Sequence, residues 1–231
     1  MKQCLLCQKR IVENFSFKWL FSFQTSGIKQ VCSTCINSFD SLKGKAVCTG
    51  CGRPGNYQNY CTDCEKWVTL GAAELLCNRS LYCYNRQMKE YFERFKFSGD
   101  YYLRLVFQKE LEAKLKENYH KGWLFVPIPV SKEVFEKRGF NQVEGLFENI
   151  CLSKMLSVKK ISKKQQSLLK RRERMQAAQP FELTTGFEKE IKGKNILLLD
   201  DIYTTGRTLY HAQALLKKAG AKKVHSVTLA R

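Results

Sequence analysis

Eight of the 11 cysteines fall into four Cys-x-x-Cys pairs, a spacing that presents two thiolates to one metal ion. Zinc fits four soft ligands without redox chemistry, and a closed set of four ligands leaves no open position for catalysis. Redox chemistry of the pairs and an iron–sulfur cluster are the alternatives. The sequence therefore predicts two structural zinc sites, with the ligands Cys4, Cys7, Cys32, Cys35, Cys48, Cys51, Cys61 and Cys64.

The order in which these pairs combine depends on the loops between them. The first two pairs are separated by 24 residues and the last two by nine, so sequential pairing closes short loops at the lowest entropic cost. An interleaved cross-brace is the alternative arrangement. The aromatic residues that alternate over 15–23 indicate a strand with one aromatic face inside the first cysteine loop. Cys77, Cys83 and Cys151 lack pair spacing, and we expect them to be small buried residues.

A second chemical signature combines two carboxylates with a loop of threonine and glycine. The apolar run 196–199 ends in adjacent aspartates, and a turn of small residues then leads into a helix. Amides at a helix N-terminus and threonine hydroxyls donate to a phosphate, and carboxylates accept from sugar hydroxyls or face a hydrated Mg²⁺. We expect a phosphate site for a ribose 5-phosphate, formed by Asp200, Asp201, Thr204, Thr205, Gly206 and Thr208.

The elements that must position this loop form a βαβ unit. Residues 195–199 and 224–229 have the pattern of buried strands, and 208–218 has helical spacing with Gly220 as its cap. We expect an α/β fold with a parallel sheet flanked by helices. A further strand is expected over 123–126, with helices over 86–97, 102–118, 133–137 and 143–156. The change in composition near residue 65 predicts a cysteine module over 1–66 and an α/β domain over 67–231.

The charge of the chain favours a polyanionic partner. Its 40 Lys and Arg against 21 Asp and Glu give a formal net charge of +19. Residues 154–174 hold nine of these cations and one acid, and such a block can follow a phosphate backbone. The expected contacts with single-stranded DNA are Lys163, Lys164, Arg171, Arg172 and Arg174. No apolar run suits a signal peptide or a membrane span, so we expect a cytoplasmic protein without membrane insertion.

These motifs resemble two known families. The loop 196–208 looks like the motif with which type I phosphoribosyltransferases bind phosphoribosyl pyrophosphate (PRPP). The segments 95–100, 126–129 and 138–142, together with the cysteine pairs, are similar to the ComF family of competence proteins, and within it to ComFC-like members. This resemblance covers nearly the whole chain. It implies that Arg138, Asn141 and Gln142 lie near the pyrophosphate side of the pocket.

The resemblance supports two hypotheses of function. In the first, the protein helps to internalise single-stranded DNA during natural transformation, with the ComFA helicase-like ATPase as partner. The zinc module would be the docking surface, and the partner would bring the protein to the inner face of the membrane. In the second, the chain is a Mg²⁺-dependent phosphoribosyltransferase that transfers phosphoribose from PRPP to a nitrogen base. The loop suits the donor in both cases, but the sequence shows no acceptor site, and fold resemblance does not establish turnover.

Overall fold

The structure, a computed structural model, describes residues 3–11, 30–72, 74–119, 122–159 and 179–231. The aromatic alternation over 15–23 lies outside these ranges, and so do the expected DNA contacts Lys163, Lys164, Arg171, Arg172 and Arg174. Both therefore remain predictions.

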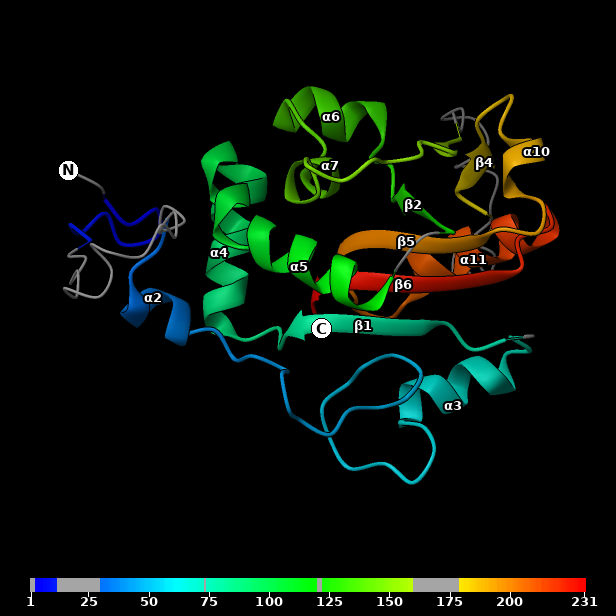
Figure 1. The fold of residues 1–231 in the computed structure, drawn as a ribbon, viewed down its shortest axis with the longest axis horizontal. Coiled ribbons are helices and arrows are strands. Elements are labelled where there is room, and N and C mark those ends of the chain that lie inside the picture. The colour runs from blue at the N-terminus through cyan, green and yellow to red at the C-terminus, as the bar shows by residue number, and fades with distance from the viewer. Residues whose placement is uncertain (1–2, 12–29, 73, 120–121, 160–178) are drawn as a thin grey trace, which may run out of the picture.

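A four-stranded parallel sheet forms the centre of the protein, as the sequence predicted (Figure 1). The strand order is β1-β6-β5-β2. The strands are β1 (Cys77–Tyr82), β2 (Trp123–Pro127), β5 (Asn195–Ile202) and β6 (Lys223–Ala230). In the register of β5 and β6, Asn195 is paired with Lys223 at the N-terminal ends of the strands, and Ile202 with Ala230 at their C-terminal ends. The strand that carries Asp200 and Asp201 thus lies between two neighbours, which fixes its direction.

The side chains of β5 are buried alternately in two separate hydrophobic cores, because successive side chains of a strand point to opposite faces of the sheet. Ile196 and Leu198 pack in the core beneath α11 (Arg207–Lys218), while Leu197 and Leu199 pack in the core beneath α4 (Arg86–Phe97) and α5 (Gln108–Asn118). Figure 1 shows α5 in front of the sheet and α11 behind it. Both faces of the sheet are covered, which explains the continuous apolar run of β5.

The helices expected over 86–97, 133–137 and 208–218 are confirmed as α4, α6 and α11. Asn85 caps α4 by accepting a hydrogen bond from the Met88 amide, 2.9 Å away. Gly220, with φ of +95°, follows the end of α11 as expected. Helix α6 spans Lys132–Arg138, and the other described α-helices outside the three predicted ones are α2 (Ser33–Asn37), α3 (Thr62–Thr69), α7 (Gln142–Leu146) and α10 (Glu188–Ile191), besides α5.

Two helix predictions were wrong in their extent. The helix expected over 143–156 ends at Leu146, because the chain beyond it turns to pair with the free edge of β2. Leu152 forms a parallel bridge with Phe125, and the Ser153 amide donates to the Phe125 carbonyl at 2.8 Å. The helix expected over 102–118 begins as a 3₁₀ helix, η1 (Tyr101–Val106), and becomes α-helical only in α5.

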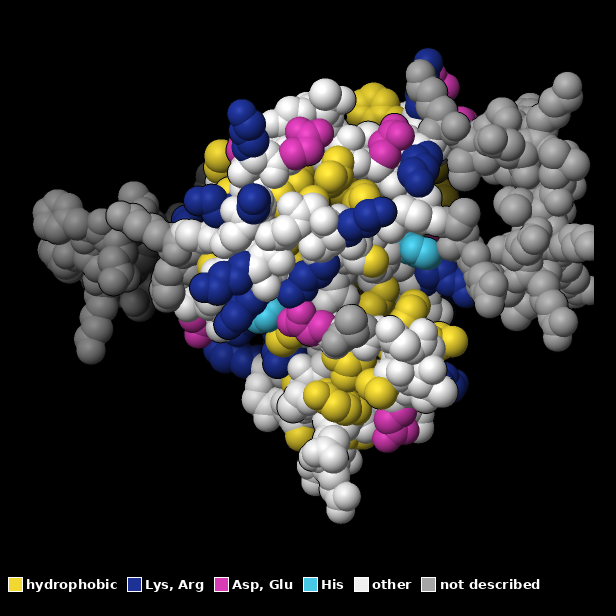
Figure 2. Space-filling model, turned by 90° about the vertical axis from the view of Figure 1, so that its right-hand side faces the viewer, with side chains coloured by type: hydrophobic (Ala, Val, Ile, Leu, Met, Phe, Trp, Pro, Cys, Tyr) yellow, Lys and Arg dark blue, Asp and Glu magenta, His cyan; other side chains and the backbone are white. Residues whose placement is uncertain are grey.

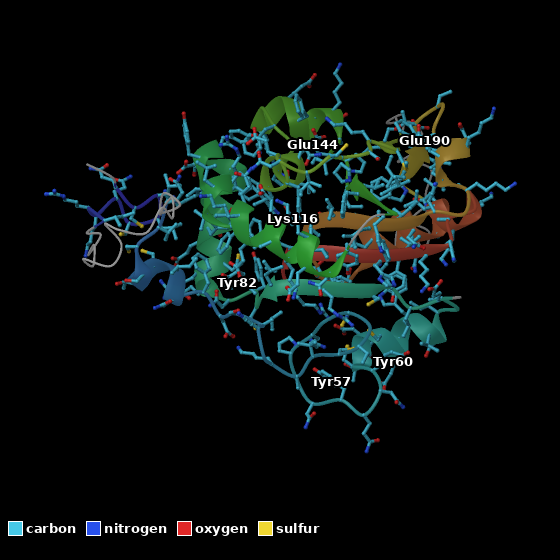
Figure 3. All side chains as sticks on the ribbon, viewed as in Figure 1. Tyr57, Tyr60, Tyr82, Lys116, Glu144 and Glu190 are labelled. Atoms are coloured by element: carbon cyan, nitrogen blue, oxygen red, sulfur yellow. The ribbon has the colours of Figure 1, made fainter. Side chains whose placement is uncertain are left out.

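Strand β1 was not predicted from the sequence, because its residues Asn78, Arg79 and Ser80 are polar. Asn78 is fully buried, yet its side chain accepts from Ser226 at 2.9 Å and donates to the Cys51 carbonyl at 3.1 Å. At the end of the strand, the Tyr82 hydroxyl, which Figure 3 labels, donates to Glu110 of α5 at 2.6 Å. Satisfied polar groups thus replace the apolar pattern that marks a buried strand.

A second, two-stranded antiparallel sheet also went unpredicted; it joins β3 (Leu156–Val158) to β4 (Phe181–Leu183). Each strand is only three residues long, too short to show a period. Within the described ranges, no helix combines the length and apolar character needed to cross a bilayer.

Candidate functional site

The eight paired cysteines gather into two groups of four in the sequential order. Within each group all four sulfur atoms lie within 4.8 Å of one another, and the second group is completely buried. A tetrahedral zinc site with Zn–S bonds near 2.3 Å requires sulfur atoms roughly 3.8 Å apart. The Sγ atoms of Cys7 and Cys32 are 3.9 Å apart, and those of Cys48 and Cys64 are 3.7 Å apart. The two groups therefore fit structural zinc, and the cross-brace alternative does not apply.

Backbone amides support the thiolates of both groups. The Cys32 amide donates to Cys4 Sγ at 3.4 Å, and the Cys61 amide donates to Cys48 Sγ at 3.3 Å. Burial opposes ionisation of Cys48, but amide donors, first that of Cys61, bring the pKa of this thiol down to about 7. Gly50 leaves room for the ligands, because a Cβ there would lie 2.8 Å from Cys64 Sγ.

Each cysteine group is fastened to a different part of the α/β domain (Figure 1). Arg94 of α4 donates to the carbonyls of Leu5 and Leu6, in the turn between the first two cysteines, at 3.1 and 2.8 Å. The second group packs below β1, where the Asn78 amide donates to the Gly50 carbonyl at 2.8 Å. Figure 3 shows Tyr57 and Tyr60 on the loop of this second group.

The unpaired cysteines differ from expectation. Cys151 is exposed, and Cys77 and Cys83 are only partly buried, so the prediction of three buried residues was wrong. Cys151 directly precedes Leu152, the residue that bridges to Phe125 of β2.

The segment 200–208 is called the phosphate loop here, after its predicted ligand. Its two aspartates lie within β5 at the C-terminal end of the strand and are almost completely buried. The Asp201 amide donates to Asp200 Oδ1 at 2.9 Å. Burial, and secondarily the adjacent Asp201 charge, raises the pKa of Asp200 to about 8. Two buried carboxylates at a strand tip have a high free energy unless a cation or hydroxyl groups meet them.

Lys96 of α4 supplies such a cation, a role that was not predicted from the sequence. Its Nζ lies 2.7 Å from Asp201 Oδ2, and it also lies 4.6 Å from the centre of the Phe92 ring. Lys96 stands between Phe95 and Phe97 in the family motif 95–100. This aromatic–cation–aromatic triplet on a helix with a buried face was the available signal.

The loop after β5 carries the threonines and the glycine for which a phosphate site was predicted. Thr204, Thr205 and Thr208 are exposed, and Gly206 immediately precedes α11 with φ of +80°. A Cβ on Gly206 would lie 2.3 Å from Tyr203 Oη, so both the backbone angle and the space require glycine. The three threonines and Arg207, the first residue of α11, are thus exposed at the C-terminal ends of the strands, where open α/β sheets bind ligands.

The C-terminal ends of β2 and β5 also lie near three further predicted site residues, Arg138, Asn141 and Gln142. Arg138 donates to Gln142 Oε1 at 2.8 Å, and its guanidinium lies 5.4 Å from the ring centre of Phe97, the neighbour of Lys96. Asn141 donates to the Ile128 carbonyl at 3.3 Å, and the Ile128 amide donates in turn to the Leu199 carbonyl at 2.9 Å. Their contact with pyrophosphate is still a prediction.

The parallel sheet and the loop define a phosphoribosyltransferase-type domain, here joined to two four-cysteine groups. The family model for the phosphoribosyl transferase domain matches residues 154–231. A 36-residue stretch is 53% identical to ribose-phosphate pyrophosphokinase of Thermococcus kodakarensis, covering 16% of this chain and 13% of that protein. The alignment with a structure of hypoxanthine phosphoribosyltransferase from Staphylococcus aureus covers 54% of this chain and 61% of that protein, at 21% identity and a TM-score of 0.32.

The whole chain identifies the family more narrowly. It is 35% identical to competence protein ComFC of Streptococcus pneumoniae over 229 residues, which cover 99% of this chain and 100% of that protein. It is 36% identical to competence protein ComFC of Bacillus subtilis over 232 residues, covering 99% and 94%. The chain belongs to the ComFC family of competence proteins, and the resemblance inferred from its motifs is confirmed.

Proposed function

We propose that this protein handles single-stranded DNA as it enters the cytoplasm during natural transformation, and that its phosphate loop binds PRPP. Membership of the ComFC family supports the competence role. The proposal of DNA binding rests on a set of exposed lysines at the N-terminal ends of the strands, opposite the phosphate loop.

This lysine edge consists of five exposed side chains at the N-terminal ends of β5 and β6: Lys192, Lys194, Lys218, Lys222 and Lys223. In the part of the chain that the structure describes, none of them belongs to an ion pair. Between Ile191 and Arg231 the only acids are Asp200 and Asp201, which are buried at the other end of β5. Figure 2 looks onto this side of the molecule, where Lys and Arg side chains form a band.

The backbone holds the loops of the lysine edge together. The Gly193 amide donates to the Gly220 carbonyl at 2.8 Å, and the Lys222 amide donates to the Lys194 carbonyl at 2.8 Å. Since both loops end in strands of the central sheet, their charges are carried on rigid elements. A phosphate backbone needs only such closely spaced cations, without base-specific contacts. Lys163, Lys164, Arg171, Arg172 and Arg174 are proposed to extend this contact.

DNA binding is tested by comparing two quadruple variants that each remove four charges. The test variant replaces Lys192, Lys194, Lys222 and Lys223 by Gln. The control replaces Lys45, Lys89, Lys114 and Lys132 by Gln, each of which is already paired with an acid. Affinity for labelled oligothymidylate is measured by anisotropy over a range of salt concentrations.

We expect only the test variant to bind more weakly, with a salt slope flatter by up to about 0.7 for each phosphate that the lysines no longer neutralise. Equal changes in both variants would show that net charge alone attracts DNA. An unchanged test variant would remove the lysine edge from the binding surface.

PRPP binding is supported by the buried carboxylates and the exposed threonines of one loop. Asp200 and Asp201 would accept from the ribose hydroxyls or face a Mg²⁺ ion that arrives with PRPP, and Thr204, Thr205 and Thr208 would donate to the 5-phosphate. When bound, Mg²⁺ would balance the charge of the pyrophosphate. Arg138 is the cation that this chain itself would contribute there.

The Asp200→Asn, Asp201→Asn variant removes these acceptors with little change of shape. We expect its PRPP affinity, measured by isothermal titration with Mg²⁺, to fall roughly tenfold or more, because hydrogen bonds to charged groups are removed. Asp40→Asn, which alters an exposed carboxylate paired with Lys45, is the control. The same affinity in all three proteins would contradict the assignment, and a pyrophosphate-release assay with nitrogen bases would test transfer.

We also propose that a ComFA-like ATPase docks on a cysteine module and brings the protein to the inner face of the membrane. The first cysteine group suits this role better, because it lies at one extremity of the molecule and Cys7 is exposed (Figure 1). Co-purification with the ATPase should be abolished in Lys9→Glu, which reverses the charge of an exposed residue beside the first cysteine pair and retains the zinc.

A further inference from the structure

Three consecutive carbonyl groups of the phosphate loop are held by two side chains that also contact the second cysteine group. Arg231 Nη1 donates to the Thr204 carbonyl at 2.9 Å and to the Tyr203 carbonyl at 3.4 Å. Trp67 Nε1 donates to the Thr205 carbonyl at 3.0 Å. These contacts join residues 28, 27 and 138 positions apart, so only the folded chain creates them.

The direction of these carbonyls decides where the amides of the loop point. In a trans peptide the C=O of one residue and the N–H of the next point to opposite sides of the same plane, and the described part of the chain has no cis peptide. Holding the carbonyls of Tyr203, Thr204 and Thr205 on the cysteine side therefore turns the amides of Thr204, Thr205 and Gly206 away from it. Among the described residues, these amides donate no hydrogen bond, which leaves them available to an anion.

Both side chains are anchored to the cysteine group itself. Arg231 Nη2 donates to Cys51 Sγ at 3.0 Å and to Asp63 Oδ2 at 3.2 Å, and only 6% of the Arg231 side chain is exposed. Trp67 lies in α3, which contains the ligand Cys64 and has the ligand Cys61 as its N-cap. Its indole ring stacks on Tyr210 of α11, with ring centres 4.0 Å apart.

We propose that the second cysteine group, with its metal bound, is a structural part of the phosphate site. Four thiolates around Zn²⁺ carry a net negative charge, and the Arg231 guanidinium compensates it on one side while orienting the loop on the other. Because metal binding supplies folding free energy to such a module, removal of the metal releases Arg231 and α3 together. The amides of the loop then lose their common orientation and bind phosphate more weakly. This inference rests on the proposed binding of PRPP.

Coupling between two sites is reciprocal. If the second metal strengthens PRPP binding, PRPP must raise the affinity for that metal by the same factor, because it stabilises the same arrangement of Arg231 and Trp67. Within the described ranges, the first cysteine group is instead linked to the α/β domain through Arg94 of α4, away from the phosphate loop. The two metals of one chain therefore respond differently to the ligand.

The direct test uses Trp67→Phe and Arg231→Lys. Phe retains a ring against Tyr210 but lacks the N–H, and Lys retains the charge but cannot span both partners. Trp123→Phe is the control for the indole, because Trp123 lies at the opposite end of the sheet. Arg79→Lys is the control for the guanidinium, because Arg79 links the Thr49 and Asn78 carbonyls, which lie outside the phosphate loop.

We expect both test variants to retain two zinc ions and to bind Mg²⁺-PRPP roughly 2- to 12-fold more weakly, the effect of one net hydrogen bond. The controls should bind as the parent does. Parent-like affinity in both test variants would overturn the proposal.

A second measurement does not require PRPP. Cys61→Ser removes a ligand of the second group and Cys35→Ser a ligand of the first, and hydrogen exchange is followed in peptides that span 203–210, with peptides of β5 and β6 as the folding control. We expect faster exchange of the loop only in Cys61→Ser. Equal loop exchange in the two variants would refute the coupling, whereas absence of PRPP binding in the parent alone would refute only the proposed ligand.

In the intact protein, equilibrium competition for zinc with a chromogenic chelator provides the reciprocal test. Added Mg²⁺-PRPP should raise the chelator concentration that removes one zinc per chain and leave that for the other unchanged. Equal effects on both, or none on either, would contradict the assignment to the second group.

Discussion

Lys96 Nζ and Asp201 Oδ2 lie 2.7 Å apart, and both side chains are largely buried, with exposures of 14% and 7%. This pair joins the C-terminal end of α4 to the tip of β5. Asp200 lies directly beside it, so one ammonium group balances two neighbouring carboxyl groups in a largely dehydrated site. The stability of the protein and the charge at the tip of β5 therefore depend on the same residue.

Replacing Lys96 by Gln should destabilise the fold strongly, because it leaves a buried carboxylate without its partner. A decrease of about 3–5 kcal/mol in the free energy of unfolding is expected at neutral pH. The decrease should shrink in acid, where carboxylates take up protons. Urea unfolding of Lys96→Gln and of Lys132→Gln measures this, the latter breaking an exposed pair worth below about 1 kcal/mol. Similar decreases in both variants would refute a special role for Lys96.

Stability should depend on pH through Asp200. Its pKa rises from 3.8 to about 8 on folding, first because of burial and then because of the Asp201 charge, while Lys96 acts in the opposite direction. Between these two values the folded state holds more protons than the unfolded state. The free energy of unfolding should therefore fall as pH rises from about 4 to about 8. In Asp200→Asn this fall should be reduced, which melting curves recorded without Mg²⁺ can check; an identical pH dependence would contradict it.

The purified protein should contain two zinc ions per chain, because both cysteine groups have the spacing of a tetrahedral site. Cys61→Ser should reduce this to about one and destabilise the protein, since structural metal binding contributes to folding. Elemental analysis with thermal melting gives both quantities. A parent value near one zinc would refute the two-site assignment.

Gly206→Ala should weaken the phosphate loop through backbone angle and steric contact together. A left-handed conformation costs a non-glycine residue roughly 1–2 kcal/mol. Gly186→Ala is the matched control, since it has φ of +99° but no atom within 4 Å of the added Cβ. At Gly206 the Cβ would meet Tyr203 Oη at 2.3 Å, so the decrease in stability should exceed that of the control. Equal melting temperatures for the two variants would show that Tyr203 moves aside freely.

Several features followed from the sequence because each depends on residues close together in the chain. The Cys-x-x-Cys pairs place two thiolates on one turn, and the short loop between Cys51 and Cys61 favours sequential pairing. The βαβ unit around Asp200 was visible because one apolar strand, one glycine turn and one amphipathic helix follow each other directly. Handedness and strand direction are then limited by the connection itself.

Other features required the tertiary structure, because they depend on which surfaces pack together. The polar strand β1 is stable only because Asn78 finds Ser226, 148 residues away, and the end of α7 is set by the free edge of β2. Lys96 meets Asp201 only when the C-terminal end of α4 reaches the tip of β5. Arg231 meets Cys51, 180 residues earlier, only when the second cysteine group is seated below the sheet. A long side chain can reach many partners, and the packing of the two cores selects the one it meets.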